Sequence, residues 1–399
     1  MPRHLIIGNG VAGTTAAAQI RKSDPHAAIR IITEEPFPFY SRIRLPEVLA
    51  GETDEKGLII RKPDWYETNR IELTLSTRVT AVDAASKKVS TAAGEDIVYD
   101  RLLLSTGASC FVPPLPGAGL PGVFTLRTLS DAIAIRDFAA GSRRKIALIG
   151  GGVLGLEAGY GLMRAGSSIT VIEVLPRLLP RQMDPEGAAL LQRCLESMGF
   201  VFYIGTAPAE ITGSGSVEAV ILADNRMIDC GAVIVSAGIR MNLSLPKELG
   251  MTIDRGLVVN DKMETGVPGI YAAGDLVQHN GQCYGIWPAA EKQGETAGIN
   301  MAGGSAEYHG TTMSNSLTVA GIDIFSAGDI DADAKKESVV SADPEKFVYR
   351  KLVFDKGVIS GAILLGDVRD RRKIMKAISE KTDVRSMKAA LSRWDLSLL

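Results

Sequence analysis

Two segments of the chain repeat the same pattern of hydrophobic and polar positions. The runs "HLIIG" at residues 4–8 and "IALIG" at 146–150 are almost entirely apolar, which is typical of parallel strands that are buried on both faces. The stretches that follow them, 14–24 and 156–166, contain many residues that favour a helix, such as alanine and leucine. Another apolar run comes after each stretch. The pattern therefore predicts two strand–helix–strand units built around parallel sheets.

In both units, a glycine-rich loop joins the predicted strand to the predicted helix. The loops carry glycine at the G-x-G-x-x-G spacing: Gly8, Gly10 and Gly13 in the first, and Gly150, Gly152 and Gly155 in the second. In this fingerprint the first glycine permits the tight turn, the second lets backbone approach a pyrophosphate, and the third lets helix pack on strand. The helix N-terminus then favours the anion. Each loop thus predicts a dinucleotide site.

Both units also place acidic residues where the second strand is predicted to end. Glu34 and Glu35 close the first unit, about 20 residues after its last glycine, and Glu173 closes the second. A carboxylate at this position accepts hydrogen bonds from the ribose hydroxyls. A duplicated fold without a function would have lost its glycines or its acid, whereas both copies keep both. We therefore expect two bound nucleotides. At the second loop, the negative charge of Glu173 favours a nucleotide that has no 2′-phosphate.

Composition narrows the class of protein. The 399 residues are 46% hydrophobic with a net charge of -2, which suits two or three globular domains and gives no reason to expect nucleic acid. No apolar run approaches the length of a membrane span, and the start resembles no signal peptide, so we expect a cytoplasmic protein. The four cysteines and four histidines are scattered without metal-ligand spacing, and no metal is expected.

Three further segments carry a resemblance to a family. They are "YDRLLLSTGAS" at 99–109, "GAVIVSAGIRMN" at 231–242 and "TGVPGIYAAGDL" at 265–276. In this order, and with the two loops, they resemble the FAD/NAD(P)H oxidoreductases with two dinucleotide folds over roughly residues 1–300. The resemblance implies FAD at the first loop and NAD(P)H at the second, where the charge of Glu173 favours NADH over NADPH. It also implies further contacts, with FAD at Val79, Thr106, Gly107, Asp275, Trp287 and Pro288, and with NAD at Gly238.

Two of these assignments have structural alternatives. Asp275 follows a buried run and precedes a segment that we expect to be helical, so a helix cap is the rival to binding the FAD ribityl chain. Trp287 is expected to border the flavin, and the rival is a fully buried core tryptophan. The accompanying family motifs favour the cofactor role of Asp275.

The segment at 35–52, "EPFPFYSRIRLPEVLAGE", contains no cysteine. In the family's disulfide reductases a cysteine pair lies here, and in related oxidases and peroxidases a single cysteine lies nearby. Without a thiolate, thiol redox chemistry at the flavin is excluded, so the flavin itself must pass the electrons on.

The same segment resembles that of NADH:rubredoxin reductases and of the flavoprotein half of the nitrite reductase large subunit. This resemblance implies that Arg42 lies against the FAD phosphates and the flavin edge; the alternative is a solvated loop arginine. A lysine that several relatives place a few residues later is absent, and Glu47 is close to that position. Glu157 resembles a family glutamate that positions the nicotinamide, although a carboxylate that complements the helix dipole is the alternative.

The C-terminal segments 308–330 and 349–378 resemble the small final domain of the same two groups. Their alternating apolar positions and amphipathic helix predict an α+β domain. The fold class is therefore α/β, with Rossmann-like FAD and NAD domains and a small α+β domain. The expected boundaries are 1–114 with 241–309 for FAD, 115–240 for NAD and 310–399 for the last domain. The chain resembles only the reductase module of the nitrite reductase large subunit, so we do not expect this chain to reduce nitrite itself.

Charge is unevenly distributed, because the segment from Lys335 onward carries a net charge of +6, with 15 Lys and Arg against 9 Asp and Glu. This basic tail either forms a solvated helix face or provides an electrostatic field that steers an acidic partner.

The predicted function is that of an FAD-dependent NADH oxidoreductase that passes electrons to a protein acceptor. That acceptor is an acidic one-electron carrier, of the rubredoxin or ferredoxin type, or a reductase partner subunit. The alternative is an NADH-sensing flavoprotein that acts through partner binding.

Overall fold

The computed structural model describes residues 2–140, 145–312 and 314–399, and it divides the chain into two compact units. The first unit contains Met1–Ile43, Asp54–Ser109 and Ile239–Thr311; the second contains Arg44–Thr53, Cys110–Gly238 and Thr312–Leu399. The division into three domains remains a prediction. The second compact unit contains both the C-terminal segment and the predicted NAD segment, and it also contains Arg44–Thr53.

A five-stranded parallel sheet forms the centre of the first unit, as the apolar runs predict. Its order is β19 (Ile270–Ala272), β7 (Arg101–Leu104), β1 (Arg3–Ile7), β2 (Ala28–Ile32) and β3 (Ile71–Thr74). The strands are short and rich in branched apolar residues because both faces are covered. The strand β2 ends at Ile32, so Glu34 and Glu35 lie beyond it rather than at its last position.

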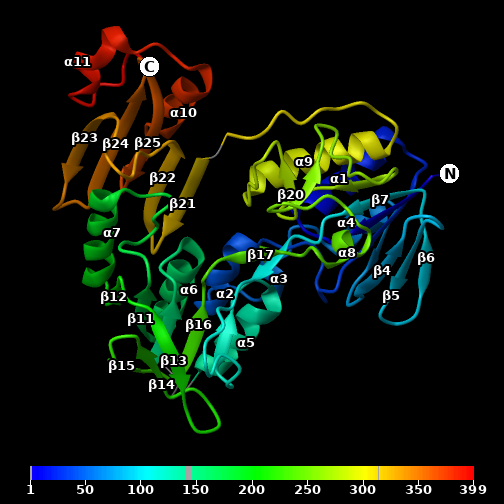
Figure 1. Cartoon of the computed structure of the whole chain (residues 1–399), viewed down its shortest axis with the longest axis horizontal. Helices are drawn as coiled ribbons and strands as arrows, with labels where there is room; N and C mark the ends of the chain where they lie inside the picture. The colour runs from blue at the N-terminus through cyan, green and yellow to red at the C-terminus, as the bar shows by residue number, and fades with distance from the viewer. Residues whose placement is uncertain (1, 141–144, 313) are drawn as a thin grey trace. The chain divides into compact units, whose positions relative to one another are not determined.

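Two helices of the first unit lie side by side, as Figure 1 shows for α1 (Val11–Ser23) and α9 (Trp287–Met301). Glycine makes this close approach possible. A Cβ on Gly294 would lie 2.4 Å from the carbonyl oxygen of Ala12, and one on Gly298 would lie 2.6 Å from that of Ala16. Further elements of this unit are β4 (Val79–Asp83), β5 (Lys88–Thr91), β6 (Asp96–Val98), β17 (Ile239–Met241), β18 (Leu257–Val259), β20 (Val277–His279), α3 (Glu55–Leu58), α4 (Pro63–Thr68) and α8 (Ser244–Glu248).

The second unit repeats the parallel arrangement. Its five-stranded sheet has the order β12 (Val201–Ile204), β11 (Ser168–Glu173), β10 (Lys145–Ile149), β16 (Ala232–Val235) and β9 (Val123–Thr125). The short helix α2 (Leu45–Leu49) packs on α5 (Leu129–Ala139) and α6 (Val153–Arg164). The approach is close, since a Cβ on Gly161 would lie 2.5 Å from the carbonyl oxygen of Pro46. A small antiparallel sheet comprises β13 (Pro208–Thr212), β14 (Ala219–Leu222) and β15 (Met227–Asp229).

The C-terminal segment of the second unit is a five-stranded antiparallel sheet with helices, as its alternating pattern predicts. The strand order is β21 (Ser314–Val319), β22 (Ile322–Gly328), β25 (Val358–Leu365), β24 (Val348–Asp355) and β23 (Glu337–Asp343). The helix α10 (Arg371–Glu380) packs on β25 and β22, while α7 (Pro185–Ser197) packs on β24 and β25. A short helix, α11 (Lys388–Leu391), completes the segment.

Candidate nucleotide and electron-transfer sites

The first glycine loop joins β1 to α1, and each of its glycines has a separate structural reason. Gly8 has φ +111°, and a Cβ there would lie 2.3 Å from the carbonyl oxygen of Ser105. A Cβ on Gly13 would lie 2.1 Å from the carbonyl oxygen of Gly8. Gly10 differs, because its Cβ would meet nothing within 4 Å. The loop is therefore tight on the side of the sheet and open at the middle glycine, as the approach of a phosphate requires.

The second glycine loop, between β10 and α6, repeats this geometry. Gly150 has φ +114°, and its Cβ would lie 2.4 Å from the carbonyl oxygen of Ser236. A Cβ on Gly155 would lie 2.7 Å from the carbonyl oxygen of Gly150, whereas Gly152 is open. Both loops thus fit a dinucleotide pyrophosphate at the N-terminus of a long helix.

A pocket lies against the first loop. Its lining includes Asn9, Gly10, Thr33, Glu35, Tyr40 and Arg42. The structure therefore brings together three predicted FAD residues, namely Gly10, Glu35 and Arg42. Glu34 is exposed and does not line this pocket, so Glu35 is the better placed of the two acids.

Arg42 is held at this pocket by specific contacts. Its guanidinium forms an ion pair with Glu35 and lies 5.7 Å from the centre of the Tyr40 ring. The Tyr40 hydroxyl donates a hydrogen bond of 2.5 Å to the same carboxylate. Arginine suits a phosphate in such a position because its planar group offers several donors. The negative charge of Glu35 is balanced locally, which leaves the pocket able to take an anion.

The other predicted FAD residues lie at turns and element ends of the first unit. Thr106 and Gly107 are tied to Asn242, whose side-chain nitrogen donates to the Thr106 carbonyl oxygen at 2.8 Å and whose backbone N–H donates to that of Gly107 at 3.0 Å. Gly107 has φ +66°, a conformation that favours glycine. Val79 is the first residue of β4.

Two expectations about the following segment are corrected. Asp275 lies in a turn between β19 and β20, so the prediction of a helix directly after it is wrong. The short run after Asp275 is apolar and β-branched, and it pairs with β18. Trp287 opens α9 and is only half-buried, with its ring 5.8 Å from that of Phe39, a residue that lines the pocket. Trp287 is therefore not a buried core residue; Pro288, next to it, is exposed.

Glu173 is buried at the end of β11, and both of its carboxylate oxygens accept backbone hydrogen bonds. Oε2 accepts from the N–H of Gly151 at 2.6 Å, and Oε1 accepts from that of Leu175 at 2.7 Å. The carboxylate therefore braces the second loop directly. Nearby Arg177 donates to the carbonyl oxygens of Met183 and Pro180, so its charge is engaged with backbone.

Glu157, one turn into α6, is partly buried and accepts a hydrogen bond of 3.0 Å from the backbone N–H of Ala320. Burial raises the pKa of this carboxyl, and the hydrogen bond offsets part of the rise. Sequence reasoning missed this contact because the two residues lie far apart in the chain. Gly238 has φ +103° with open space beside its α-carbon, and its carbonyl oxygen accepts from Phe111.

The thiols are unsuited to redox chemistry. All four cysteines, Cys110, Cys194, Cys230 and Cys283, are free. Burial raises the pKa of every one of them, to about 12 for Cys230. The thiolate is the reactive form, so a raised pKa lowers the reactive fraction of each side chain at neutral pH.

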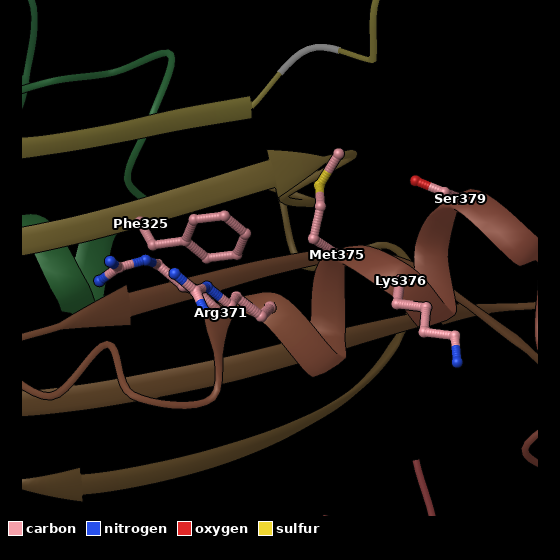
Figure 2. A pocket seen from close by; sticks show the side chains of 6 residues that line it. Phe325, Arg371, Met375, Lys376 and Ser379 are labelled. Carbon is pink, nitrogen blue, oxygen red and sulfur yellow. The ribbon is translucent and has the colours of Figure 1, made fainter.

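A second pocket lies on the C-terminal segment, between β22 and α10, and Figure 2 shows Arg371 beside the ring of Phe325 with Met375 further along the helix. Its lining combines apolar side chains with cations: Phe325, Arg371, Arg372, Met375, Lys376 and Ser379.

Across the part of the chain that the structure describes, no cluster of His, Cys, Asp and Glu could hold a metal ion. No helix in those residues is long and apolar enough to cross a membrane.

Comparison with known proteins assigns the class. Residues 2–294 match the family described as pyridine nucleotide-disulphide oxidoreductase, and the chain belongs to this family. Residues 314–382 match the rubredoxin NAD+ reductase C-terminal domain. The family uses FAD and NADH, which agrees with the cofactors predicted for the two loops. The predicted resemblance and fold class are confirmed.

Particular relatives are similar over almost the whole chain. The NADH-rubredoxin oxidoreductase of Clostridium acetobutylicum is 34% identical over 375 residues, which cover 94% of this chain and 93% of the relative. A crystal structure of the NADH:rubredoxin oxidoreductase from that organism matches with a TM-score of 0.84 at 31% identity, covering 98% of this chain and 99% of the other. The nitrite reductase [NAD(P)H] of Bacillus subtilis is 36% identical over 95% of this chain, which spans only about half of that relative, 47%.

Proposed function

We propose that this chain is an FAD-dependent NADH oxidoreductase that passes electrons to a protein acceptor. The observation that carries the proposal is the presence of two complete pyrophosphate cradles, each with an open middle glycine, in a chain that has no cysteine in the segment 35–52. One cradle serves FAD and the other NADH. When bound, FAD supplies hydride acceptance from NADH and release of single electrons. We place the protein in the cytoplasm, where free thiols are kept reduced.

The residues divide the work of binding. In the first loop Gly10 receives the pyrophosphate, and Glu35 accepts the ribose hydroxyls while its charge is balanced by Arg42, whose remaining guanidinium N–H groups can donate to a phosphate. In the second loop Gly152 receives the pyrophosphate of NADH, and Glu173 binds the ribose while it braces the turn. Glu157 orients the nicotinamide ring, and Asp275 binds the ribityl chain of FAD. The arrangement is one of positioning, because the chemistry belongs to the cofactors.

The acceptor is an acidic one-electron carrier of the rubredoxin or ferredoxin type, or a reductase partner subunit. The similar NADH-rubredoxin oxidoreductase and the matching C-terminal domain are both named for rubredoxin, and the charges of the C-terminal segment support this assignment. About half of its cations form ion pairs, for instance Lys336 with Asp329 and Lys388 with Glu337. In contrast, Arg371, Arg372 and Lys376 at the second pocket have no ion pair with any described acidic residue. The unpaired charge is thus concentrated on α10.

The test is anaerobic stopped-flow spectroscopy of the FAD-loaded protein. NADH should bleach the flavin absorbance rapidly, and oxidised rubredoxin or ferredoxin added next should restore it with turnover. Failure of NADH to reduce the flavin would refute the proposal. Rapid reduction without turnover by any carrier or partner subunit would instead favour the NADH-sensing flavoprotein.

A further inference from the structure

A chain of hydrogen bonds fixes the side-chain amide of Asn9, the residue between the first two glycines of the first loop. The backbone N–H of Phe39 donates to the Tyr66 hydroxyl at 3.1 Å, and this hydroxyl lies 3.0 Å from Asn9 Oδ1. Tyr66 is 3% exposed, so its single hydrogen needs an acceptor within the protein. If the amide were reversed, two donors would face each other and the tyrosine hydrogen would have no acceptor. The network therefore assigns Oδ1 to the side of Tyr66.

With Oδ1 facing Tyr66, the amide nitrogen Nδ2 of Asn9 must point the other way. Asn9 is 8% exposed, and its Nδ2 is buried without a hydrogen-bond partner among the described residues. Asn9 lines the first pocket, together with Gly10 and Arg42. Buried donors in native proteins are almost always satisfied, so an unpaired amide nitrogen at a pocket indicates a ligand acceptor.

The surroundings define the chemistry of that ligand. The helix α1 begins directly after Gly10 with no side-chain cap and no acidic residue in its first turn. Donors and partial positive charge therefore dominate this end of the pocket, while the carboxylate of Glu35 is already engaged by Arg42 and Tyr40. An anionic oxygen matches these groups.

We infer that Asn9 Nδ2 donates a hydrogen bond to a phosphate oxygen of the dinucleotide in the first loop, and that Tyr66 is a positioning residue that presents it. The inference rests on the proposed binding of FAD at this loop. Asn9 occupies a variable position of the glycine fingerprint, and Tyr66 lies 57 residues further on, in α4. The relay thus adds a side-chain donor to a site that the fingerprint describes only through backbone.

The experiment measures FAD binding to apoprotein by quenching of flavin fluorescence. Asn9→Ala should weaken FAD affinity about 10- to 100-fold, the range for losing a hydrogen bond to a charged group, with little change for riboflavin, which has no phosphate. Tyr66→Phe should weaken it several-fold, since Asn9 Oδ1 then keeps only the longer hydrogen bond of 3.3 Å from the Thr14 hydroxyl and the amide is held less firmly. The matched control is Tyr99→Phe, because the Tyr99 hydroxyl is also buried but has no partner among the described residues.

The double variant separates positioning from packing. Tyr66→Phe should have no further effect on FAD affinity in an Asn9→Ala background, because its role is exerted through Asn9. If Asn9→Ala fails to fold, Asn9→Asp keeps the shape and removes both donors. Wild-type protein without FAD affinity would refute the proposed function. Wild-type protein that binds FAD, with Asn9→Ala and Asn9→Asp both within twofold of it, would overturn the inference alone. An equal effect of Tyr66→Phe in both backgrounds would reduce Tyr66 to a packing residue.

Discussion

The carboxylate of Glu157 and the backbone N–H of Ala320 form a hydrogen bond of 3.0 Å, although 163 residues separate them in the sequence. Ala320 and Gly321 form the two-residue turn between β21 and β22, with φ +51° and +78°. Such a turn favours Asn-Gly, and an alanine in the left-handed region costs roughly 1–2 kcal/mol. The strained residue Ala320 is also the one whose backbone N–H donates to Glu157 on α6. The orientation of the Glu157 side chain therefore depends on the C-terminal segment as well as on α6.

Replacement of Glu157 should affect the NADH half-reaction. If this side chain orients the nicotinamide, Glu157→Ala should slow flavin reduction about 10- to 100-fold, corresponding to roughly 1.4–2.7 kcal/mol of transition-state stabilisation. Glu157→Gln should lose less, because its side-chain oxygen still accepts from Ala320. Single-turnover stopped-flow at saturating NADH gives the rate directly. Equal rates for wild type and Glu157→Ala would assign the residue to the helix dipole instead.

The raised pKa of Glu157 predicts a pH dependence of stability. The native state binds this proton more tightly than the unfolded state, so the stabilisation is complete below the ordinary value of 4.5 and is lost as pH rises through the raised pKa. Glu157→Gln has no such titration. Urea unfolding from pH 4 to 8 should show the wild type losing stability relative to the variant across that window. A difference that is independent of pH, or that grows in the opposite direction, contradicts the assignment.

A buried ion pair joins the C-terminal sheet to the second nucleotide segment. Lys351 donates to Asp184 at 3.0 Å with side-chain exposures of 3% and 7%, and the Tyr349 hydroxyl donates to the same carboxylate at 2.7 Å. Burial and the Asp184 carboxylate raise the pKa of Tyr349. Lys351→Met leaves a buried charge uncompensated and should cost about 3–5 kcal/mol in urea unfolding. The control is Lys335→Met, which breaks an exposed pair with Asp333 and should change stability little.

Coenzyme choice should depend on Glu173. A 2′-phosphate about 5 Å from this carboxylate, at an effective dielectric near 20, is disfavoured by roughly 3 kcal/mol, or about a hundredfold in affinity. Glu173→Gln should narrow the NADH preference but should also weaken NADH binding, because a carboxamide cannot accept from both Gly151 and Leu175 with its one oxygen. Titrations with both coenzymes test this. Efficient use of NADPH by the wild type would show that Glu173 does not discriminate between the 2′-hydroxyl of NADH and the 2′-phosphate of NADPH.

Carrier reduction should be sensitive to salt and to the charge of α10. Screening shortens the steering range to about 8 Å at physiological ionic strength, so the second-order rate should fall as salt rises. Reversal of Arg371, Arg372 and Lys373 to Glu should slow carrier reduction at least several-fold and leave flavin reduction by NADH unchanged. Lys356→Glu, at the exposed β24–β25 turn, is the control. If neither salt nor the reversal matters to the carrier step, α10 is a solvated face.

Local rules explain what could be predicted from the sequence. The two sheets follow from uninterrupted apolar runs, and the glycine positions follow because a Cβ on Gly8 or Gly150 would collide with backbone. The choice between Glu34 and Glu35 could not be made, because it depends on where the strand ends and which side chain turns inward. The helix predicted after Asp275 failed because a short apolar run fits a strand or a helix equally well.

Contacts between distant residues were beyond that reasoning. The relay from Tyr66 to Asn9 and the bond from Ala320 to Glu157 join segments that have no common pattern in the sequence. Lys351 looked like one charge among many in a basic tail, yet it is buried with Asp184. Ion pairing also decides which cations remain available to a partner, whereas the composition gives only the net charge of the segment.

The interrupted course of the first unit has a consequence for synthesis on the ribosome. Its segment Asp54–Ser109 is followed by the whole of Cys110–Gly238 before Ile239–Thr311 emerges. At 5–20 residues per second, this interval lasts on the order of 10 s. Until α9 and β19 arrive, the Ala12 and Ala16 face of α1 and the outer edge of β7 remain uncovered. We therefore expect the nascent chain to require chaperone protection at this stage, and a ribosome-bound fragment ending before residue 270 to be sensitive to protease.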